Sequence, residues 1–233
     1  GTGVKPCPVF LNRFGAGIND KLHPVMTDKT LLIINSEQTE NRCLELAEAL
    51  GYEPSLREVK DPVECIIDEG SEHDAIMVCP GALVASPTAK VLVINGPNLN
   101  LLGTREPEIY GKETLDDIAS RCIGKASEAG MDVTFRQSNH EGEIVDWIQQ
   151  AIGNMDVIVI NAAAYTHTSV AIHDALRAFD GCKVELHISN PHRRELFRHI
   201  SYVSTAVDAV VAGFGTQGYD LVIDLLVESI DAS

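Results

Sequence analysis

Arg105 and Tyr110 lie five residues apart in a polar loop, residues 96–111, that directly follows an apolar run. Tyrosine is normally a weak base, with an unperturbed pKa of about 10. A neighbouring guanidinium stabilises the phenolate and lowers that pKa. A loop with both side chains could therefore act as a lid that delivers a base to a bound substrate. The alternative is a surface tyrosine beside a surface arginine.

His187 ends another apolar run, and positively charged residues follow it. Asn190 can cap a helix and Pro191 suits a first turn, so a helix start is predicted whose N–H groups attract a carboxylate. Arg194 and Arg198 are four residues apart and would share one face of that helix. These groups would form an anion site with a proton donor beside it. The alternative is a solvated basic helix face next to a hydrogen-bonded histidine.

Asn161 and His167 follow a third apolar run. An asparagine at that position can orient a water or an oxyanion, whereas His167 is too ambiguous to assign by itself. The stretch GFGTQG resembles a dinucleotide-binding turn only superficially, because it follows the last predicted strand. The sequence has no Walker A pattern, and none of its six cysteines forms a CxxC pair, so a zinc site has little support.

The formal net charge of −16 argues against nucleic acid and against anionic membrane surfaces as partners. A small anionic substrate remains compatible with the sequence, because basic residues gather between 183 and 198. No apolar run approaches the roughly 20 residues that a bilayer span needs. The first residues lack the layout of a signal peptide, so a cytoplasmic location is expected.

Apolar runs alternate with amphipathic stretches of helical period from residue 91 onward. The runs predict five strands, at residues 91–95, 132–137, 156–161, 183–187 and 209–212. The amphipathic stretches predict helices at residues 114–129, 142–152, 169–178, 193–199 and from 219 to the end. This alternation implies an α/β fold, a flavodoxin-like doubly wound sheet of five parallel strands.

Ligands of such sheets bind beyond the carboxyl ends of the strands. The polar stretches of the sequence follow all five predicted strands. We therefore expect them to meet at one rim of the sheet and to form the functional site there.

The front of the chain contains a weaker version of the same pattern. Residues 30–89 repeat the order of elements of the first half of the main domain, but Pro80 stands where Asn161 does. We expect a degenerate, non-catalytic βαβ half-repeat that docks on the catalytic domain at 90–233 or on a neighbouring chain, because half a sheet leaves an open edge. Residues 1–29 are expected to form an arm. The alternative is that all βαβ units look somewhat alike.

Residues 91–233 resemble type II 3-dehydroquinate dehydratases, or type II dehydroquinases, over that family's whole domain. Five ordered segments carry the resemblance: NGPNLNLLGTREPEIYG, RQSNHEGEIVDWI, NAAAYTHTSVAIHDAL, HISNPHRRELFRH and GFGTQGY. The resemblance implies a flavodoxin-like fold and a dehydration of 3-dehydroquinate to 3-dehydroshikimate in the shikimate or quinate pathway. In that family a proton leaves C2, an enolate forms, and the C1 hydroxyl departs as water in an anti elimination.

The resemblance implies roles for the reacting groups, position by position. Tyr110 resembles the base, and Arg105 resembles its activator on the lid. His187 resembles the acid that protonates the leaving hydroxyl. Asn161 resembles the holder of the water that stabilises the enolate. Asn98 lies in the matching pocket loop and would help to orient the tyrosine region.

The resemblance also implies substrate contacts. Ile188 and Ser189 resemble the backbone site for the carboxylate, and Arg194 matches another active-site arginine. His167 and Arg198 resemble the contacts to the ring hydroxyls.

Two further matches concern support and assembly. Glu185 resembles the partner that orients His187. Asp174 resembles a residue that reaches the site of a neighbouring subunit, which implies homotrimers that commonly stack by fours into a dodecamer. No metal and no cofactor is expected.

The sequence departs from the family in two places. Ile200 stands where the family often has histidine, and residues 1–89 are absent from ordinary members, so they could block assembly or alter lid motion. Two rival interpretations are a non-enzymatic flavodoxin-like binding or regulatory protein and a flavin or nucleotide carrier. The presence of Arg105 and Tyr110 with the other reacting groups favours the enzyme, because a pure binder does not need a tyrosine base.

Overall fold

The structure is a computed structural model that describes residues 29–35, 52–58, 75–78, 88–104 and 112–231. Side chains are described for residues 88–104 and 112–227. No helix in these ranges is both long enough and apolar enough to cross a membrane.

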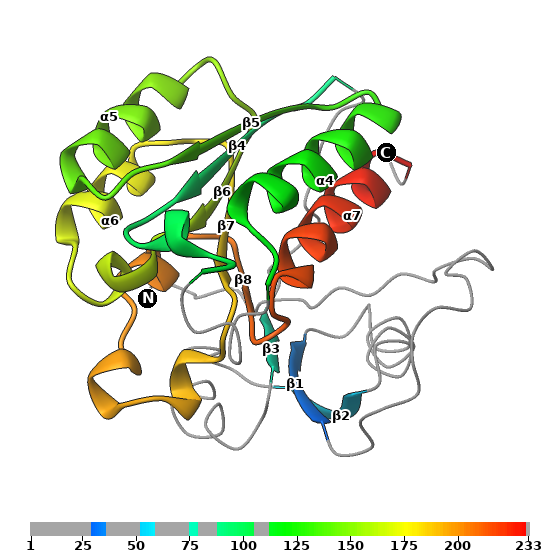
Figure 1. Cartoon of the computed structure of the whole chain (residues 1–233), viewed down its shortest axis with the longest axis vertical. Helices are drawn as coiled ribbons and strands as arrows, with labels where there is room; N and C mark the ends of the chain where they lie inside the picture. The colour runs from blue at the N-terminus through cyan, green and yellow to red at the C-terminus, as the bar shows by residue number, and fades with distance from the viewer. Residues whose placement is uncertain (1–28, 36–51, 59–74, 79–87, 105–111, 232–233) are drawn as a thin grey trace, which may run out of the picture.

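A parallel sheet with the strand order β5-β4-β6-β7-β8 forms the centre of the main domain (Figure 1). This is the flavodoxin-like order, and it confirms the predicted fold class. Side chains alternate across each strand, so a continuous apolar run serves two cores at once. The strands are β4 (Lys90–Asn95), β5 (Asp132–Gln137), β6 (Val157–Asn161), β7 (Cys182–His187) and β8 (Ala209–Ala212).

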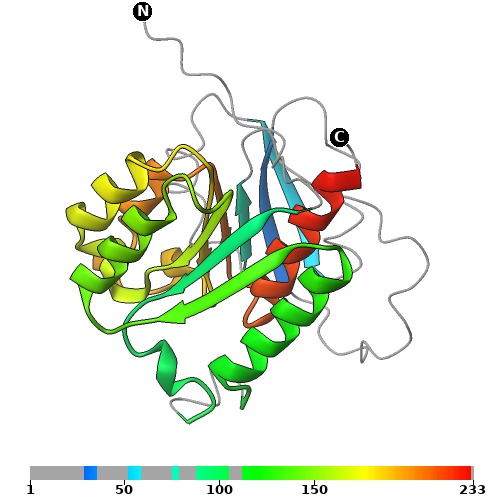
Figure 2. The same ribbon diagram turned by 90° about the horizontal axis from the view of Figure 1, so that it is seen from above.

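Helices cover both faces of this sheet (Figure 2). Val91 and Val93 of β4 point into the core beneath α4 and α7, whereas Leu92 and Ile94 point into the core beneath α5 and α6. The sheet is therefore doubly wound, as the sequence predicts. The helices are α4 (Leu115–Glu128), α5 (Glu141–Ala151), α6 (Val170–Arg177) and α7 (Gln217–Asp231).

Local sequence sets where two of these helices begin. Thr114 caps α4 in a capping box, in which its hydroxyl accepts from the N–H of Asp117 and the Asp117 carboxylate accepts from the Thr114 N–H. Ser169 caps α6 by accepting from the N–H of Ile172 at 2.9 Å. Both caps lie on the rim that carries the candidate site, so they fix how the chain enters and leaves it.

Three strands from the front of the chain continue the same sheet beyond β8. Among themselves they run parallel in the order β2-β1-β3, which repeats the order β5-β4-β6 of the main domain. The last of them, β3, pairs with β8 in antiparallel orientation. These strands are β1 (Lys29–Asn35), β2 (Tyr52–Glu58) and β3 (Ala75–Val78). The arm predicted at 1–29 lies outside the described residues, except for Lys29, which begins β1. The helices of the predicted half-repeat also lie outside the described residues.

The helix predicted for residues 193–199 is wrong. The chain forms two separate 3-10 turns there, η4 (Pro191–Arg193) and η5 (Leu196–Arg198). Between them the backbone is extended at Arg194 and Glu195. Arg194 and Arg198 thus lie on different segments and do not share a helix face.

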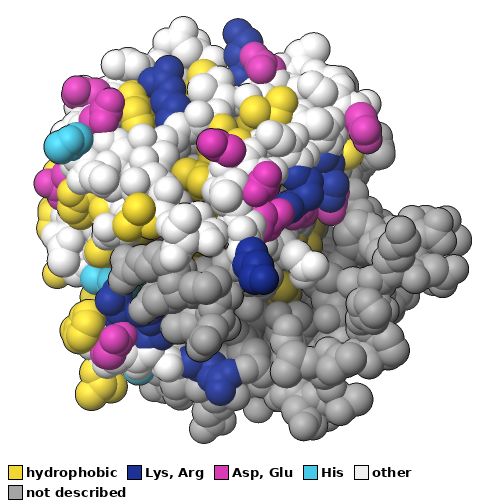
Figure 3. Space-filling view, in the orientation of Figure 1, with side chains coloured by type: hydrophobic (Ala, Val, Ile, Leu, Met, Phe, Trp, Pro, Cys, Tyr) yellow, Lys and Arg dark blue, Asp and Glu magenta, His cyan; other side chains and the backbone are white. Residues whose placement is uncertain are grey.

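The side chains of this segment explain why no helix forms. Leu196 and Phe197 are 83% and 67% exposed, so an amphipathic helix here would have no core against which to pack its apolar face. Apolar side chains accordingly show at the lower left of the face in Figure 3, where Figure 1 places the orange segment. Asn190 is a cap as predicted, but it caps the short 3-10 turn η4: its side chain accepts from the N–H of His192.

Candidate active site

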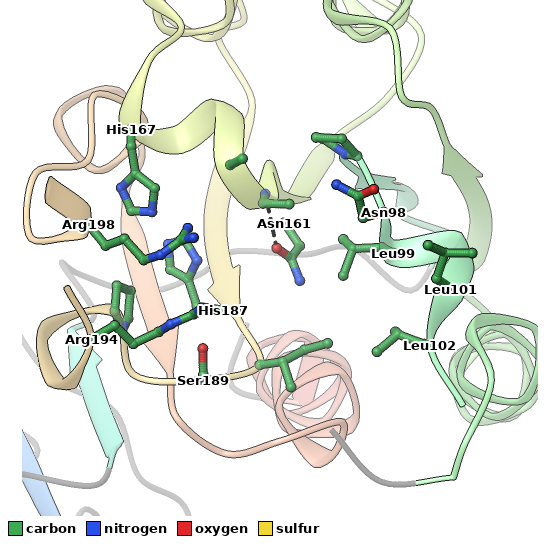
Figure 4. A pocket seen from close by; sticks show the side chains of 15 residues that line it. Asn98, Leu99, Leu101, Leu102, Asn161, His167, His187, Ser189, Arg194 and Arg198 are labelled. Carbon is green, nitrogen blue, oxygen red and sulfur yellow. Dashed lines mark hydrogen bonds between the residues drawn. The ribbon is translucent and has the colours of Figure 1, made fainter. Parts of the chain in front are cut away.

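A pocket of about 200 Å³ opens beyond the carboxyl ends of β4, β6 and β7 (Figure 4). In Figure 4 the histidines and arginines lie on one side of it, Asn161 lies near its centre, and the leucines lie on the other side. The described residues that line the pocket are Pro97, Asn98, Leu99, Leu101, Leu102, Asn161, Ala163, Ala164, His167, His187, Ile188, Ser189, Pro191, Arg194 and Arg198.

Three of the five predicted polar stretches line this pocket, and the other two support it from outside. Asn139, after β5, accepts from the backbone N–H of Asn98 at 2.9 Å. Tyr219, after β8, binds the Asn161 side chain. The prediction that the stretches meet at one rim is therefore confirmed for 97–102, 161–167 and 187–198.

The loop after β4 approaches the end of β6 closely. Gly96 donates its N–H to the Asn161 carbonyl at 2.8 Å, and a Cβ at position 96 would lie 2.3 Å from the Ala162 oxygen. Glycine is thus required here by space. Two residues later Asn98 adopts a left-handed conformation, with φ of 68°, that turns the chain into η2 (Leu99–Leu101).

Asn161 is buried, and its amide is held at both ends. Its Oδ1 accepts from the N–H of Ala163 at 3.2 Å, and its Nδ2 donates to the Tyr219 hydroxyl at 3.0 Å. The Tyr219 hydroxyl in turn donates to Asn95 Oδ1 at 2.6 Å. Because a primary amide has two N–H groups, one of them remains beyond the bond to Tyr219 for a pocket ligand.

Tyr219 is only 2% exposed. Burial raises the pKa of its phenol well above the usual range, and the hydrogen bond from Asn161 opposes this only in part. Tyr219 therefore keeps its proton and acts as a fixed donor to Asn95.

His187 and Glu185 form a buried pair on β7. The two residues are two positions apart and so face the same side of the strand. His187 Nε2 lies 2.8 Å from Glu185 Oε1. A carboxylate accepts only, so Nε2 carries a proton and Nδ1 is the ring nitrogen left for the pocket.

Glu185 is completely buried, yet it is ionised. Burial is the largest effect and raises its pKa, but the charge and hydrogen bond of His187 and the hydroxyls of Ser204 and Thr166 outweigh it and hold the pKa at about 2. The Glu185 carboxylate thus fixes the orientation of the His187 ring through Nε2.

His167 lies on the same side of the pocket as His187 and is held by the backbone (Figure 4). Its Nδ1 lies 2.8 Å from the Ile200 carbonyl, which can only accept, so Nδ1 carries the proton. Burial is the main cause of its lowered pKa, and the charges of His187 and Arg198 act in the same direction. The ring is therefore neutral near pH 7 and offers Nε2 as an acceptor. Because Ile200 contributes only its backbone, the departure from the family at that position leaves this contact intact.

The pocket is positively charged although the chain is acidic. No Asp or Glu is among the described residues that line it. Arg198 donates from Nε to Glu195 at 2.8 Å, and the same carboxylate lies 3.6 Å from Arg194 Nε. Arg194 and Arg198 therefore both lie near Glu195 and both line the pocket, although the predicted helix is absent.

Eight of the predicted site residues line the pocket, and Glu185 supports it through His187. Arg105 and Tyr110 lie outside the described residues. Asp174 lies on α6, where its side chain is 71% exposed and contacts His173 at 2.9 Å.

Four residues that support the site were not predicted from the sequence. Tyr219 holds Asn161, and Thr166, Ser201 and Ser204 bind Glu185. The signal that could have identified Thr166 and Tyr219 is position, since both belong to polar stretches after predicted strands, whereas Ser201 and Ser204 come after the predicted helix 193–199. Hydroxyl side chains are common in loops, however, and the sequence alone does not distinguish these from their neighbours.

Known proteins resemble the chain from residue 89 onward. The model of the family described as dehydroquinase class II matches residues 89–227. The 3-dehydroquinate dehydratase of Cereibacter sphaeroides is 60% identical over 136 residues, which are 58% of this chain and 92% of that protein. The 3-dehydroquinate dehydratase 2 of Pseudomonas aeruginosa is 54% identical over 146 residues, 63% of this chain and 99% of that protein.

A solved structure agrees with these sequence relatives. The type II dehydroquinase of Propionibacterium acnes superposes with a TM-score of 0.59 at 44% identity, and the match covers 62% of this chain and 99% of that one. Both the sequence and the fold of the main domain therefore match one family over nearly its whole length, and the chain belongs to the class II dehydroquinase family.

Proposed function

We propose that this chain dehydrates 3-dehydroquinate to 3-dehydroshikimate without a cofactor, in the cytoplasm, through an enolate. The observation that carries the proposal is the pair His187–Glu185 in a pocket that also holds Asn161 and two arginines. A proton next to a ketone needs a base and a stabilised enolate, and a departing hydroxyl needs an acid. The identity of the substrate is inferred from the family, and the proposed site has a group for each of these tasks.

Tyr110 is the proposed base and Arg105 its activator. Both belong to the seven residues between Thr104 and Lys112. A Cβ at Gly103 would lie 2.8 Å from the Lys112 carbonyl, so the two ends of this loop meet. Leu102, one residue before Gly103, lines the pocket. Seven extended residues span at most roughly 25 Å, so a residue within the loop can reach the pocket.

The proposed reaction transfers one proton to Tyr110 and one proton to the leaving hydroxyl. The Tyr110 phenolate takes the C2 proton, and the C2–H electron pair forms the enolate. The enolate collapses to a C1=C2 double bond as the C1–O bond breaks, and protonated His187 gives a proton to the leaving hydroxyl, which departs as water. Asn161 holds the water that stabilises the enolate, using the N–H that Tyr219 does not accept.

The remaining pocket groups are proposed to bind substrate. The backbone of Ile188 and Ser189 receives the carboxylate, and Arg194 adds positive charge near it. His167 Nε2 accepts from one ring hydroxyl and Arg198 donates to another. Asn98, at the mouth of the loop, orients the tyrosine region.

The assembly is proposed to be a homo-oligomer built from trimers, with a dodecamer as the larger form. Asp174 is exposed on α6 and can therefore reach the site of a neighbouring subunit. Leu196, Phe197 and Ile200 are more than 60% exposed beside the pocket, which suits burial against another copy.

The first test is an ultraviolet assay that follows the conjugated product from 3-dehydroquinate. We expect activity in the full chain and a loss of at least about 10²-fold in Tyr110→Phe, the typical contribution of a positioned base. Tyr202→Phe, an exposed tyrosine outside the pocket lining, is the matched control and should keep its rate. A folded but inactive wild type would contradict the dehydratase proposal, and an active Tyr110→Phe would contradict the assignment of the base.

A further inference from the structure

Glu185 is enclosed by hydroxyl groups. Thr166 and Ser201 donate to its Oε1 at 2.5 and 2.8 Å, and Ser204 donates to its Oε2. With His187 Nε2 at 2.8 Å, four donors point at one carboxyl group that is 0% exposed. Three of these contacts are made at Oε1 and one at Oε2, and the Thr166 and Ser201 hydroxyls also lie 2.7 Å from each other.

The hydroxyls come from two loops that are fixed to each other. Thr166 belongs to η3 (Ala163–His167), Ser201 precedes η6 (Val203–Ala206), and Ser204 lies within it. The N–H of Tyr202 donates to the Thr166 carbonyl at 2.8 Å, and the N–H of Ser204 donates to Ser201 Oγ at 3.0 Å. The same two loops carry His167, which lines the pocket, and the Ile200 carbonyl that holds its Nδ1.

A buried ion pair always competes with its neutral form. The proton between Nε2 and Oε1 can stay on His187, which gives imidazolium and carboxylate, or move to Glu185, which gives two neutral groups. Burial favours the neutral pair because both charges lose water. Donors aimed at the carboxylate favour the ion pair, because a hydrogen bond to a charged acceptor is stronger than one to its neutral form.

Other charges near the pair cannot replace the hydroxyls. His167 from η3 is neutral near pH 7, and burial lowers the pKa of His192 from η4 to about 4. Arg198 from η5 binds Glu195. On the sheet, Glu185 pairs in register with Ile160 of β6 and with Val210 of β8, which are both apolar.

We propose that Thr166, Ser201 and Ser204 are positioning residues that stabilise Glu185 as a carboxylate and thereby hold the ring of His187 through its Nε2–H. The inference rests on the proposed function in one respect, since His187 is the proposed acid. Its electrostatic part concerns the substrate-free protein and can be tested there.

The decisive measurement is an NMR titration of the full chain with ¹³C-labelled glutamate carboxyls and ¹⁵N-labelled histidine. Glu185→Gln identifies the Glu185 signal. Each charge-assisted hydrogen bond shifts such an equilibrium by about tenfold or more. In Thr166→Val/Ser204→Ala we therefore expect Glu185 to take up its proton at a pH about two units higher than in the wild type.

Thr205→Val is the matched control. Thr205 is next to Ser204, is exposed, and donates to the Tyr202 carbonyl instead of Glu185. It should titrate like the wild type. If the double variant also titrates like Thr205→Val, the proposal is overturned. If the double variant does not fold, Ser204→Ala alone must still show a shift of about one unit, and the absence of that shift also overturns the proposal.

Activity separates this inference from the proposed function. We expect the double variant to lose at least about tenfold in kcat while its KM changes little, because the hydroxyls do not line the pocket. A shifted titration in a protein that never dehydrates 3-dehydroquinate would retain the inference about the pair and contradict the proposed function. An active double variant in which the titration of Glu185 is not shifted would retain the proposed function and contradict the inference about the pair.

Discussion

Tyr219 and Asn161 are hydrogen-bonded at 3.0 Å although 58 residues separate them in the sequence. Tyr219 lies in the first turn of α7, and its hydroxyl also donates to Asn95 at the end of β4. One phenol thus joins the carboxyl ends of β4 and β6 beneath the pocket. Because the other end of the Asn161 amide is held by the Ala163 N–H, the amide has one orientation.

Tyr219→Phe should therefore reduce kcat by about tenfold with little change in KM, since Asn161 keeps its place but loses its fixed orientation. The buried amides left without a partner should also lower the free energy of unfolding by about 1–3 kcal/mol. Steady-state kinetics and denaturant unfolding measure the two effects. Tyr202→Phe, which removes an exposed hydroxyl, should show neither effect. A Tyr219→Phe enzyme with a wild-type kcat would show that the orientation of Asn161 does not limit the reaction.

Glu185 makes stability depend on pH in a definite direction. Its pKa is held at about 2 in the folded chain, compared with an ordinary value of 4.5. The unfolded chain therefore binds the proton first as pH falls, so the stabilisation is complete above about pH 4.5 and is lost towards pH 2. We expect the stability difference between wild type and Glu185→Gln to change by on the order of 3 kcal/mol over this range. Urea unfolding at several pH values tests this, and parallel curves for the two proteins would contradict it.

His167 should act on substrate binding more than on the chemical step. Its Nε2 can accept a hydrogen bond from a substrate hydroxyl only while the ring is neutral, and the pKa of the ring is lowered. We expect KM to be flat near pH 7 and to rise only as pH falls below the usual histidine range. His167→Leu should raise KM by about tenfold, the effect of losing one hydrogen bond of about 1.4 kcal/mol. His167→Gln, which retains an acceptor, should be less impaired, and equal KM values for the two variants would argue against an acceptor role.

The sheet could be predicted because its signals are local. The alternation within β4 sends Val91 and Val93 to one core and Leu92 and Ile94 to the other, and the run that results is visible in the sequence. The rim site followed from the positions of polar residues after these runs. Asn161, His187, Arg194 and Arg198, which line the pocket, were found in this way, whereas Asn98, Ile188 and Ser189 were assigned only through the resemblance to the family.

The residues that support the site could not be predicted, because they depend on contacts between residues distant in the sequence. The hydroxyls of Thr166 and Ser204 lie 19 residues before and after Glu185, and no periodic pattern links them. The helix predicted at 193–199 failed for the opposite reason. Its local signals were sound, but the tertiary structure provides no core for Leu196 and Phe197.

Gly96 and Gly124 provide a matched pair of glycine-to-alanine substitutions with opposite expected signs. At Gly96 the new methyl group would lie 2.3 Å from the Ala162 oxygen and 2.6 Å from its carbonyl carbon, so backbone must move. The loop that shifts carries Asn98 into the pocket, and its partner strand ends at Asn161. We expect a loss of several kcal/mol in stability, in the range typical of overpacking, together with a loss of activity.

At Gly124, in the middle of α4, a Cβ meets nothing within 4 Å. Alanine there restricts the unfolded chain and favours the helix, so Gly124→Ala should raise stability by about 0.5–1 kcal/mol and leave activity unchanged. Thermal unfolding and kcat/KM of both variants measure these effects. If Gly96→Ala were as stable and as active as Gly124→Ala, the close approach of the β4 loop to the end of β6 could not be what shapes the pocket.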